Sequence, residues 1–409
     1  MYSIGNSIRM SFAMLVIWIV VPTVSFSGGP APTITTIETS LSFKFPFGIA
    51  VDHNGHIIIS HDGRMISRIG KNGQMHPVAG GVVKDFEGDG KPASQALLFG
   101  PGRFTFDQQG NLFVPDMGNH RIRKIDYPSG VITTVVGHGP TGRGKGSFAG
   151  DGGPGSEAFL NRPISVVFDS TGALYIADAA NFRVRKVTPG EDGIITGAPD
   201  EIIETIAGIG KRGFSNDKKL AVSARIAAID LAIDRADQLF LADGGNNRIR
   251  RVDKDTGIIT TVIGSGPFGE VAGYSGNGSD AKHARMSSSE GIVFDSAGNL
   301  YIADVLNHRV RMVTPGRDGL ITGETDEIIT TIVGSGTIGI EAGGLQGDGG
   351  PALESKLNQP QDMVIDAEGN LVVVDGLNHR LRRVILHPKV MMPIHAPYER
   401  AVDFPQQNM

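Results

Sequence analysis

Short apolar runs separated by turn residues recur along this chain from about residue 33 to residue 385. Most runs are rich in Ile, Val and Leu, and in every unit one run instead alternates polar and apolar side chains. Runs of this length, with glycine and Asp or Asn between them, predict β-strands rather than helices. One unit therefore predicts four strands, at residues 163–169, 173–177, 183–187 and 203–207.

One phrase of the form Asp-x-x-Asn-x-Arg-x-Arg occurs five times, always between the second and third predicted strands. A further Asp stands nine residues before each phrase, and a sixth, imperfect copy begins at Asp52. Self-similarity at a long and nearly constant period predicts stacked supersecondary units. The phrase residues are interpreted as structural: Asp116, Asn119, His120, Arg121; Asp178, Asn181, Arg183; Asp243, Asn246, Arg248; Asp304, Asn307, His308, Arg309; Asp375, Asn378, His379, Arg380.

Four short antiparallel strands per repeat predict an all-β fold, a six-bladed β-propeller. The last repeat has only three strands, whereas residues 33–38 match the fourth strand of the other repeats. We therefore expect this N-terminal strand to complete the last blade and to close the ring, which removes two exposed sheet edges. The predicted propeller spans 33–385, with blades at 45–80, 98–137, 160–208, 226–264, 286–334 and 357–385.

The two ends of the chain differ from the repeats. Residues 1–27 contain Arg9, an apolar run at 12–21 and small residues before position 28, a pattern typical of a secretory signal peptide. An uncleaved membrane anchor is the alternative. The sequence thus predicts a signal peptide at 1–27, a linker at 28–32, a C-terminal tail at 386–409, and a secreted or periplasmic protein with no membrane span after cleavage.

Composition narrows the function less than it narrows the fold. The chain has 57 glycines, no cysteine and a formal net charge of −5. Without cysteine there can be no disulfide, no thiolate metal site and no Cys nucleophile. An acidic balance lacks the basic surface that nucleic-acid binding needs, so nucleic acid is not an expected partner. We expect a monomer.

The five phrases and the Leu-Tyr-Ile-Ala-Asp strands before them resemble NHL repeats, which build β-propellers. The resemblance covers about residues 33–385, although Phe182 and Asn247 replace the histidine and the first blade lacks the phrase. The glycine-rich linkers at 149–154 and 346–351 resemble those of exported bacterial NHL proteins. The resemblance implies binding platforms as well as a zinc-dependent lyase and calcium-dependent lactonases and esterases, so the fold does not select the function.

The start of the first strand is the position at which the blades differ most. This strand lines the channel of a propeller, and its start lies on the face of the inter-blade loops. Carboxylates and an amide there could hold Ca²⁺, and an arginine could hold an anion. The candidate ligand-binding residues at this channel mouth are Arg103, Asp230, Glu290, Gln361 and Asp362, of which Asp230, Glu290 and Asp362 are the candidate metal ligands.

Other metal interpretations are weaker. The phrase histidines recur once per blade, so they must lie far apart around the ring. The linkers Glu87-Gly-Asp-Gly90 and Gly150-Asp-Gly-Gly153 offer few carboxylates, and their glycines more simply supply a tight reversal. In the first blade, His53 and His56 lie at the opposite end of a strand from His61, so a shared metal site is not expected.

Two classes of function follow. The first is an exported binding or scaffold propeller that recognises a protein or carbohydrate through its loop-rich face. The alternative is a metal-dependent hydrolase or lyase at the channel mouth, in which the cation polarises a carbonyl or activates water and Arg103 orients an anionic substrate. No set of catalytic residues can be named from the sequence, so the binding function is favoured.

Overall fold

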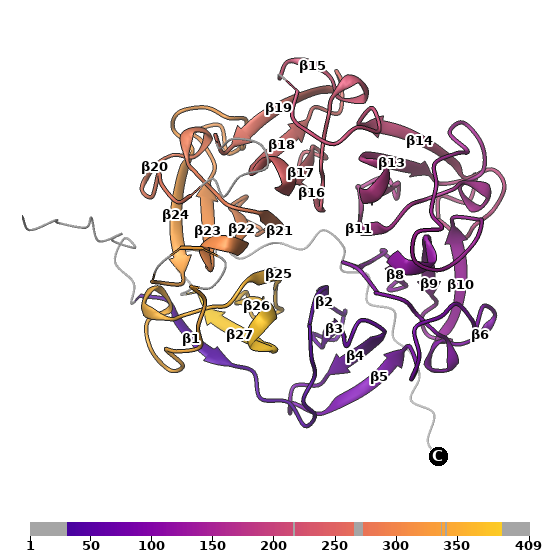
Figure 1. Cartoon of the computed structure of the whole chain (residues 1–409), viewed down its shortest axis with the longest axis horizontal. Helices are drawn as coiled ribbons and strands as arrows, with labels where there is room; N and C mark the ends of the chain where they lie inside the picture. Colours follow the sequence, from indigo (N-terminus) through magenta and orange to yellow (C-terminus); the bar gives the residue numbers. More distant parts are fainter. Residues whose placement is uncertain (1–30, 216, 266–272, 337, 340–341, 387–409) are drawn as a thin grey trace, which may run out of the picture.

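Six antiparallel sheets surround a central channel (Figure 1). Five are each built from one contiguous stretch of chain, and the sixth combines the last repeat with the N-terminal strand. The computed structural model describes residues 31–215, 217–265, 273–336, 338–339 and 342–386. The predicted signal peptide at 1–27 and nearly all of the predicted tail at 386–409 lie outside these residues. The innermost strands are β2 (Ile49–Val51), β7 (Thr105–Phe106), β11 (Pro163–Phe168), β16 (Asp230–Ile233), β21 (Ser289–Phe294) and β25 (Pro360–Ile365).

The next strands follow in order toward the rim of the propeller. The second strands are β3 (Ile57–His61), β8 (Leu112–Asp116), β12 (Leu174–Asp178), β17 (Leu239–Asp243), β22 (Leu300–Asp304) and β26 (Leu371–Asp375). The third are β4 (Met65–Ile69), β9 (Arg121–Ile125), β13 (Arg183–Thr188), β18 (Arg248–Val252), β23 (Arg309–Thr314) and β27 (Arg380–Ile385). The fourth are β5 (Met75–Ala79), β10 (Val131–Val136), β14 (Ile202–Ala207), β19 (Ile258–Ile263), β24 (Ile328–Val333) and β1 (Thr33–Thr36).

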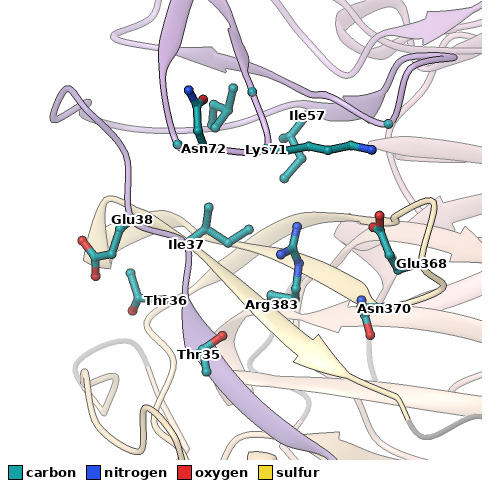
Figure 2. Close-up of a pocket in the computed structure, with 14 residues that line it drawn as sticks. Thr35, Thr36, Ile37, Glu38, Ile57, Lys71, Asn72, Glu368, Asn370 and Arg383 are labelled. Carbon is teal, nitrogen blue, oxygen red and sulfur yellow. The ribbon is translucent and has the colours of Figure 1, made fainter.

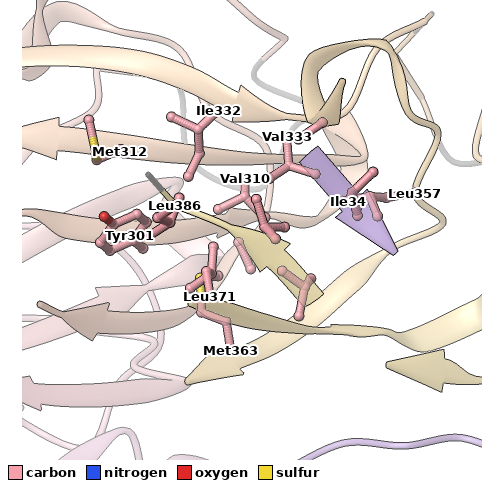
Figure 3. Close-up of a cluster of buried hydrophobic side chains, with 14 of the residues drawn as sticks. Ile34, Tyr301, Val310, Met312, Ile332, Val333, Leu357, Met363, Leu371 and Leu386 are labelled. Atoms are coloured by element: carbon pink, nitrogen blue, oxygen red, sulfur yellow. The ribbon is translucent and has the colours of Figure 1, made fainter. Parts of the chain in front are cut away.

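The predicted closure of the ring is confirmed. Strand β1 pairs with β27 in the sheet of the last blade, with Ile34 opposite Val384. Ile34 is fully buried and lies beside Leu357 and Val333 in the core between the fifth and sixth blades (Figure 3). Burial of an isoleucine contributes about 2 kcal/mol through the hydrophobic effect, so packing and strand pairing act together to close the ring.

Three sheets have a fifth strand that the sequence did not reveal. These two-residue strands come from the inter-blade linkers and pair with the fourth strand of the following blade: β6 (Lys91–Pro92), β15 (Lys219–Leu220) and β20 (Ser279–Asp280). A 3-10 turn follows at the same place in five linkers: η1 (Ala93–Gln95), η3 (Gly155–Glu157), η5 (Ala221–Ser223), η7 (Ala281–His283) and η9 (Ala352–Glu354). A small buried residue opens each turn, glycine in η3 and alanine in the other four, and lets the linker pack closely against the blade.

The repeated phrase forms a 3-10 turn between the second and third strands. The turns are η2 (Met117–Asn119), η4 (Ala179–Asn181), η6 (Gly244–Asn246), η8 (Val305–Asn307) and η10 (Gly376–Asn378). In the second blade, the Asp116 carboxylate accepts hydrogen bonds from the Phe99 backbone and the Asn119 side chain. His120 has φ +59° and its Nε2 contacts the carbonyl of Gly142 at 2.8 Å. These contacts join the turn to the linker.

The second arginine of the phrase is the residue whose burial the sequence did not predict. The alternating third strand suggested one solvated face, yet Arg185 is fully buried and contacts Asp178 at 3.8 Å and the linker carboxylate of Asp151 at 2.6 Å. Both arginines of this phrase lie over the Phe148 ring, Arg183 at 3.8 Å and Arg185 at 4.9 Å from its centroid. The linker carboxylates therefore bind arginine within the fold, in the place where a calcium site was the alternative.

Candidate functional site

The channel mouth brings together the side chains of Arg103, Asp230, Glu290 and Asp362, which come from four different blades. The innermost strands approach closely here, since Arg103 and Ser165 of neighbouring blades form a parallel bridge. Gly48 occupies the matching position in the first blade, and a Cβ atom there would lie 2.2 Å from the carbonyl oxygen of Gly102. The channel mouth is thus too narrow for every blade to place a side chain in it, and one long side chain fills its centre.

Arg103 occupies that centre. Its side chain is almost fully buried and crosses the channel, where Nη2 donates to the Gln361 carbonyl at 2.9 Å and to Glu290 Oε2 at 3.3 Å, and Nη1 donates to the Ile229 carbonyl at 3.3 Å. The Phe47 ring lies 4.4 Å from the guanidinium carbon. Arg103 therefore contacts the first, fourth, fifth and sixth blades from the second.

Asp230 and Asp362 flank the guanidinium and also join neighbouring blades. The Nε atom of Arg103 lies 4.0 Å from Asp230 Oδ2 and 3.9 Å from Asp362 Oδ1. Asp230 accepts hydrogen bonds from the Ser165 hydroxyl and the Ile292 backbone, and Asp362 accepts from the backbones of Ile49 and Met363. Each carboxylate oxygen therefore already has a donor from the protein.

Comparison with known proteins agrees with this geometry. No family model matches the chain. NHL repeat-containing protein 2 of Bos taurus is 26% identical over 399 residues, covering 88% of this chain and 49% of the relative. Five blades carry the phrase, all six sheets lie in one closed ring, and the relative that the chain resembles is an NHL-repeat protein.

The chain is an NHL-repeat β-propeller.

Two solved structures share the fold of this NHL propeller. One is a structural genomics protein of unknown function from Bacteroides thetaiotaomicron, with TM-score 0.58, 17% identity and coverage of 87% of this chain and 76% of that protein. The other is an auxiliary nutrient binding protein from the same organism, with TM-score 0.57, 15% identity and coverage of 86% and 75%. The chain spans about half the length of the curated relatives it matches. The NHL propeller fold supports a binding or scaffold role.

The residues at the mouth of the NHL propeller do not fit a metal site as they are arranged. The three candidate ligands Asp230, Glu290 and Asp362 surround the Arg103 guanidinium, and a buried cation raises the electrostatic cost of a second one between them. Within the part of the chain that the structure describes, no three His, Asp or Glu side chains are grouped so that they could hold a metal ion. Gln361 takes part through its carbonyl, while its side chain contacts Gln359.

The phrase and first-blade histidines have separate roles. His308 contacts the carbonyl of Gly339, in the linker that follows the fifth blade. His379 accepts a hydrogen bond from the Phe45 backbone. His56 pairs with Asp52 and His61 with Asp62, so the structure does not bring these two histidines to one site. Among the described residues, no helix has the length and apolar content to cross a bilayer.

Burial raises the pKa values of the two aspartates at the channel mouth. Burial raises the pKa of Asp362 to about 8, with the charge of Asp230 adding to the shift and that of Arg103 opposing it, and burial also raises the pKa of Asp230. Near neutral pH, Asp362 therefore holds a proton in the folded protein. With Asp362 protonated, the channel mouth has two carboxylates, Asp230 and Glu290, beside the Arg103 guanidinium.

The raised pKa of Asp362 predicts a pH-dependent stability. Between the unfolded pKa near 3.8 and the folded pKa of about 8, the folded state binds the proton and the unfolded state does not. Stability from this group is thus fully present below pH 3.8 and is lost as the pH rises to 8, by up to about 1.4 kcal/mol per pH unit. We expect the Asp362→Asn variant to lose less stability than the wild type between pH 6.5 and 8.5 in urea unfolding. Equal slopes for the two proteins would contradict this assignment.

Proposed function

We propose that this NHL propeller is an exported binding protein that recognises a protein ligand through the loop-rich face over its first blade. The proposal is supported by one observation above all: the first blade, which lacks the phrase, is bordered on this face by exposed apolar side chains. Phe45 is 62% exposed and Val82 is 88% exposed. Val83 and Leu377 are also exposed, and all four side chains lie in loops or turns of the loop-rich face. Exposed apolar side chains on one face are typical of interaction surfaces.

Hydrogen bonds fix the backbone around the turn of the first blade, next to Phe45. The Phe45 ring packs edge-on against His379 of the sixth blade, with centroids 4.9 Å apart. Its neighbour Lys44 donates its backbone N–H to Asp62 Oδ1 at 3.0 Å. Gly63, in the same turn, accepts a hydrogen bond from Gly100 at the end of the linker that carries Val82. The surface, defined here as Phe45, Val82, Val83 and Leu377, is thus presented by a rigid scaffold.

A protein ligand fits this surface better than a carbohydrate. Apolar and aromatic anchors without a convergent set of hydrogen-bond donors favour desolvation of a partner's apolar side chains. The closed channel mouth supports the same view, because Arg103 occupies the place that a channel-mouth enzyme would give to a cation and its substrate. Export rests on the leader-like residues 1–27, and we expect a mature N-terminus at Gly28.

The test compares two faces of the propeller. Immobilised wild-type protein is used to capture material from the envelope and the culture medium, and captured partners are then titrated individually. We expect the Phe45→Ser/Val82→Ser variant to bind the partner at least about tenfold more weakly, which corresponds to about 1.4 kcal/mol. The Ile209→Ser control, which changes an exposed isoleucine on a linker between the third and fourth blades, should bind as the wild type does. A partner that does not distinguish these variants would place recognition elsewhere.

A further inference from the structure

The junctions between blades contain a repeated apolar site, and in three of them a side chain from the same chain fills it. Each site is built from four positions: one in the second strand of a blade, one in its fourth strand, and two in the second and third strands of the next blade. Between the second and third blades these are Phe113, Val135, Leu174 and Val187. Ile195, from the long insert of the third blade, is 2% exposed and packs into this set.

The other two filled junctions repeat this packing with different parts of the chain. Ile321, from the insert of the fifth blade, is 2% exposed and packs in the core that contains Phe240, Val262, Leu300 and Val313. Leu386, directly after β27, does the same with Tyr301, Ile332, Leu371 and Val384. Figure 3 shows Leu386 and Tyr301 together at this junction. The site therefore accepts an aliphatic side chain delivered by the segment that follows a third strand.

The inserts also show how the backbone approaches the site. Glu201 accepts hydrogen bonds from the backbones of Thr196 and Gly197, which fixes the loop after Ile195. A Cβ atom on Gly197 would lie 3.2 Å from the Cα atom of Val135, so the loop rests directly on the fourth strand of the preceding blade. In the fifth blade, a Cβ atom on Gly323 would lie 3.3 Å from the Cα atom of Val262, so this loop rests on the fourth strand of the fourth blade in the same way. A segment of the form Ile-Thr-Gly is thus matched to this groove.

The junction between the third and fourth blades has the same four positions but no insert. Tyr175, Ile206, Leu239 and Val252 line a cavity of about 460 Å³ there. The fourth blade has only the short turn at 253–257 after its third strand, so nothing corresponding to Ile195 covers Ile206. Ile206 is accordingly only partly buried, whereas Val135 and Val262 at the same position are fully buried.

We propose that this groove between the third and fourth blades binds an extended segment of a partner protein that presents an isoleucine or leucine flanked by basic residues. Leu220 and Val222 of the linker add exposed apolar wall, at 52% and 44% exposure. The rim has more carboxylates than ammonium groups, namely Asp169, Asp237, Asp253 and Asp255 against Lys186 and Lys254. Complementary charge on the partner would favour association and fix its register.

Other occupants fit less well. The described chain begins and ends in the sixth blade, across the ring from this groove (Figure 1). In a second copy of the protein, the two Ile-Thr-Gly segments carry Ile195 and Ile321, which are already buried in its own junctions. The site is independent of the surface around Phe45, because it is lined in part by the turns between first and second strands, at the opposite end of those strands.

A second open groove, between the sixth and first blades, serves as an internal comparison. It has a volume of about 580 Å³, and Ile37 and Ile57 face it from its two sides (Figure 2). Its rim is more mixed, with Lys71 and Arg383 beside Glu38 and Glu368. The apolar Leu220 and Val222 have no counterpart in its lining, so we assign the basic, aliphatic segment to the groove between the third and fourth blades.

The experiment uses the full chain and a labelled peptide, Lys-Lys-Gly-Leu-Ile-Thr-Gly-Lys-Lys, whose centre copies residues 319–323. We expect saturable binding by fluorescence anisotropy that weakens at least about tenfold in Val222→Glu and with a peptide carrying Asp in place of Ile. Binding should be unchanged in Leu41→Glu, an exposed site before the first blade, and in Lys71→Glu at the other groove. Higher salt should weaken binding, because Lys254 and Asp255 on the rim are exposed and salt screens exposed charges.

Three outcomes would overturn the proposal. One is no saturable binding to wild type at millimolar protein, and another is binding that Val222→Glu leaves intact. The third is a concentration-dependent dimer in sedimentation velocity that Val222→Glu abolishes and the peptide disperses, which would assign the groove to a second copy. Thermal unfolding checks that the Val222→Glu variant is folded, because a substitution at this exposed site should leave the melting temperature within about 2 °C of wild type.

Discussion

Replacement of Arg103 by alanine is expected to lower the free energy of unfolding by about 3–5 kcal/mol. The reason is electrostatic rather than steric. Asp230, Glu290 and Asp362 would remain at the channel mouth without their shared cation, and Asp230 and Asp362 are each nearly fully buried. The two backbone carbonyls that accept from Arg103 would also lose their donor. Guanidinium chloride unfolding followed by circular dichroism measures the change.

The controls separate charge from general damage. Arg317→Ala removes an arginine whose side chain is 96% exposed and should change stability by less than about 0.5 kcal/mol. Arg103→Ala/Asp230→Asn should recover part of the loss, since one of the two unpaired carboxylates becomes neutral. If Arg103→Ala were as stable as Arg317→Ala, the ring of charges would have no structural role. Stabilisation of Arg103→Ala by added Ca²⁺ would show that these carboxylates can bind a cation once the guanidinium is gone.

The position of Arg103 at the channel mouth also bears on the proposed function. The candidate residues at the channel mouth join five blades around one guanidinium, and Ser165 of the third blade donates a hydrogen bond to Asp230 beside it. Stability of the closed ring then leaves the loops and the grooves between blades as the surfaces free to bind. Both proposed binding surfaces lie there: one around Phe45 on the loop-rich face, and the other around Ile206 between two blades.

Local patterns were sufficient to predict most of the fold. The four strands, the turn at each phrase and the match between residues 33–38 and the fourth strands all depend on neighbours in sequence, so the sequence predicts them well. The two-residue strand Lys91–Pro92 could not be predicted, because so short a pairing is set by how the linker packs on the next blade. The burial of Arg185 was missed for a similar reason, since its partners Asp151 and Asp178 lie on two different segments.

The site was predictable in its members but not in its arrangement. Alignment of the repeats placed Arg103, Asp230 and Asp362 at one level of the channel, and the structure brings them together. Which residue fills the centre depends on how closely the strands approach, and that follows from Gly48 and Gly102 in three dimensions. The repeats did contain one unused signal: Ile195 and Ile321 stand at the same place in two inserts, and the blade between them has no such residue.

Deletion of residues 33–37 is expected to destabilise the propeller by more than about 4 kcal/mol and to promote aggregation. The deletion removes fully buried Ile34, whose truncation alone would cost about 2–5 kcal/mol, and the pairing of β1 with β27. It also leaves β27 as an exposed edge, which other chains can pair with. Chemical unfolding and light scattering measure the two effects, and Ile34→Asp should reproduce most of the loss of stability.

A control and a rescue make this prediction specific to closure of the ring. Glu38→Ala, just beyond the strand at an exposed position, should be neutral within about 0.5 kcal/mol. A synthetic peptide of residues 31–38 added to the deletion variant should restore stability in proportion to its concentration, because it binds only the folded ring. If the deletion variant remained monomeric and as stable as Glu38→Ala, the other three strands of the last blade would be enough to close the propeller. The pairing of Ile34 with Val384 and the core around Leu357 argue for the opposite result, since this blade would otherwise be the one that ends in an unpaired strand.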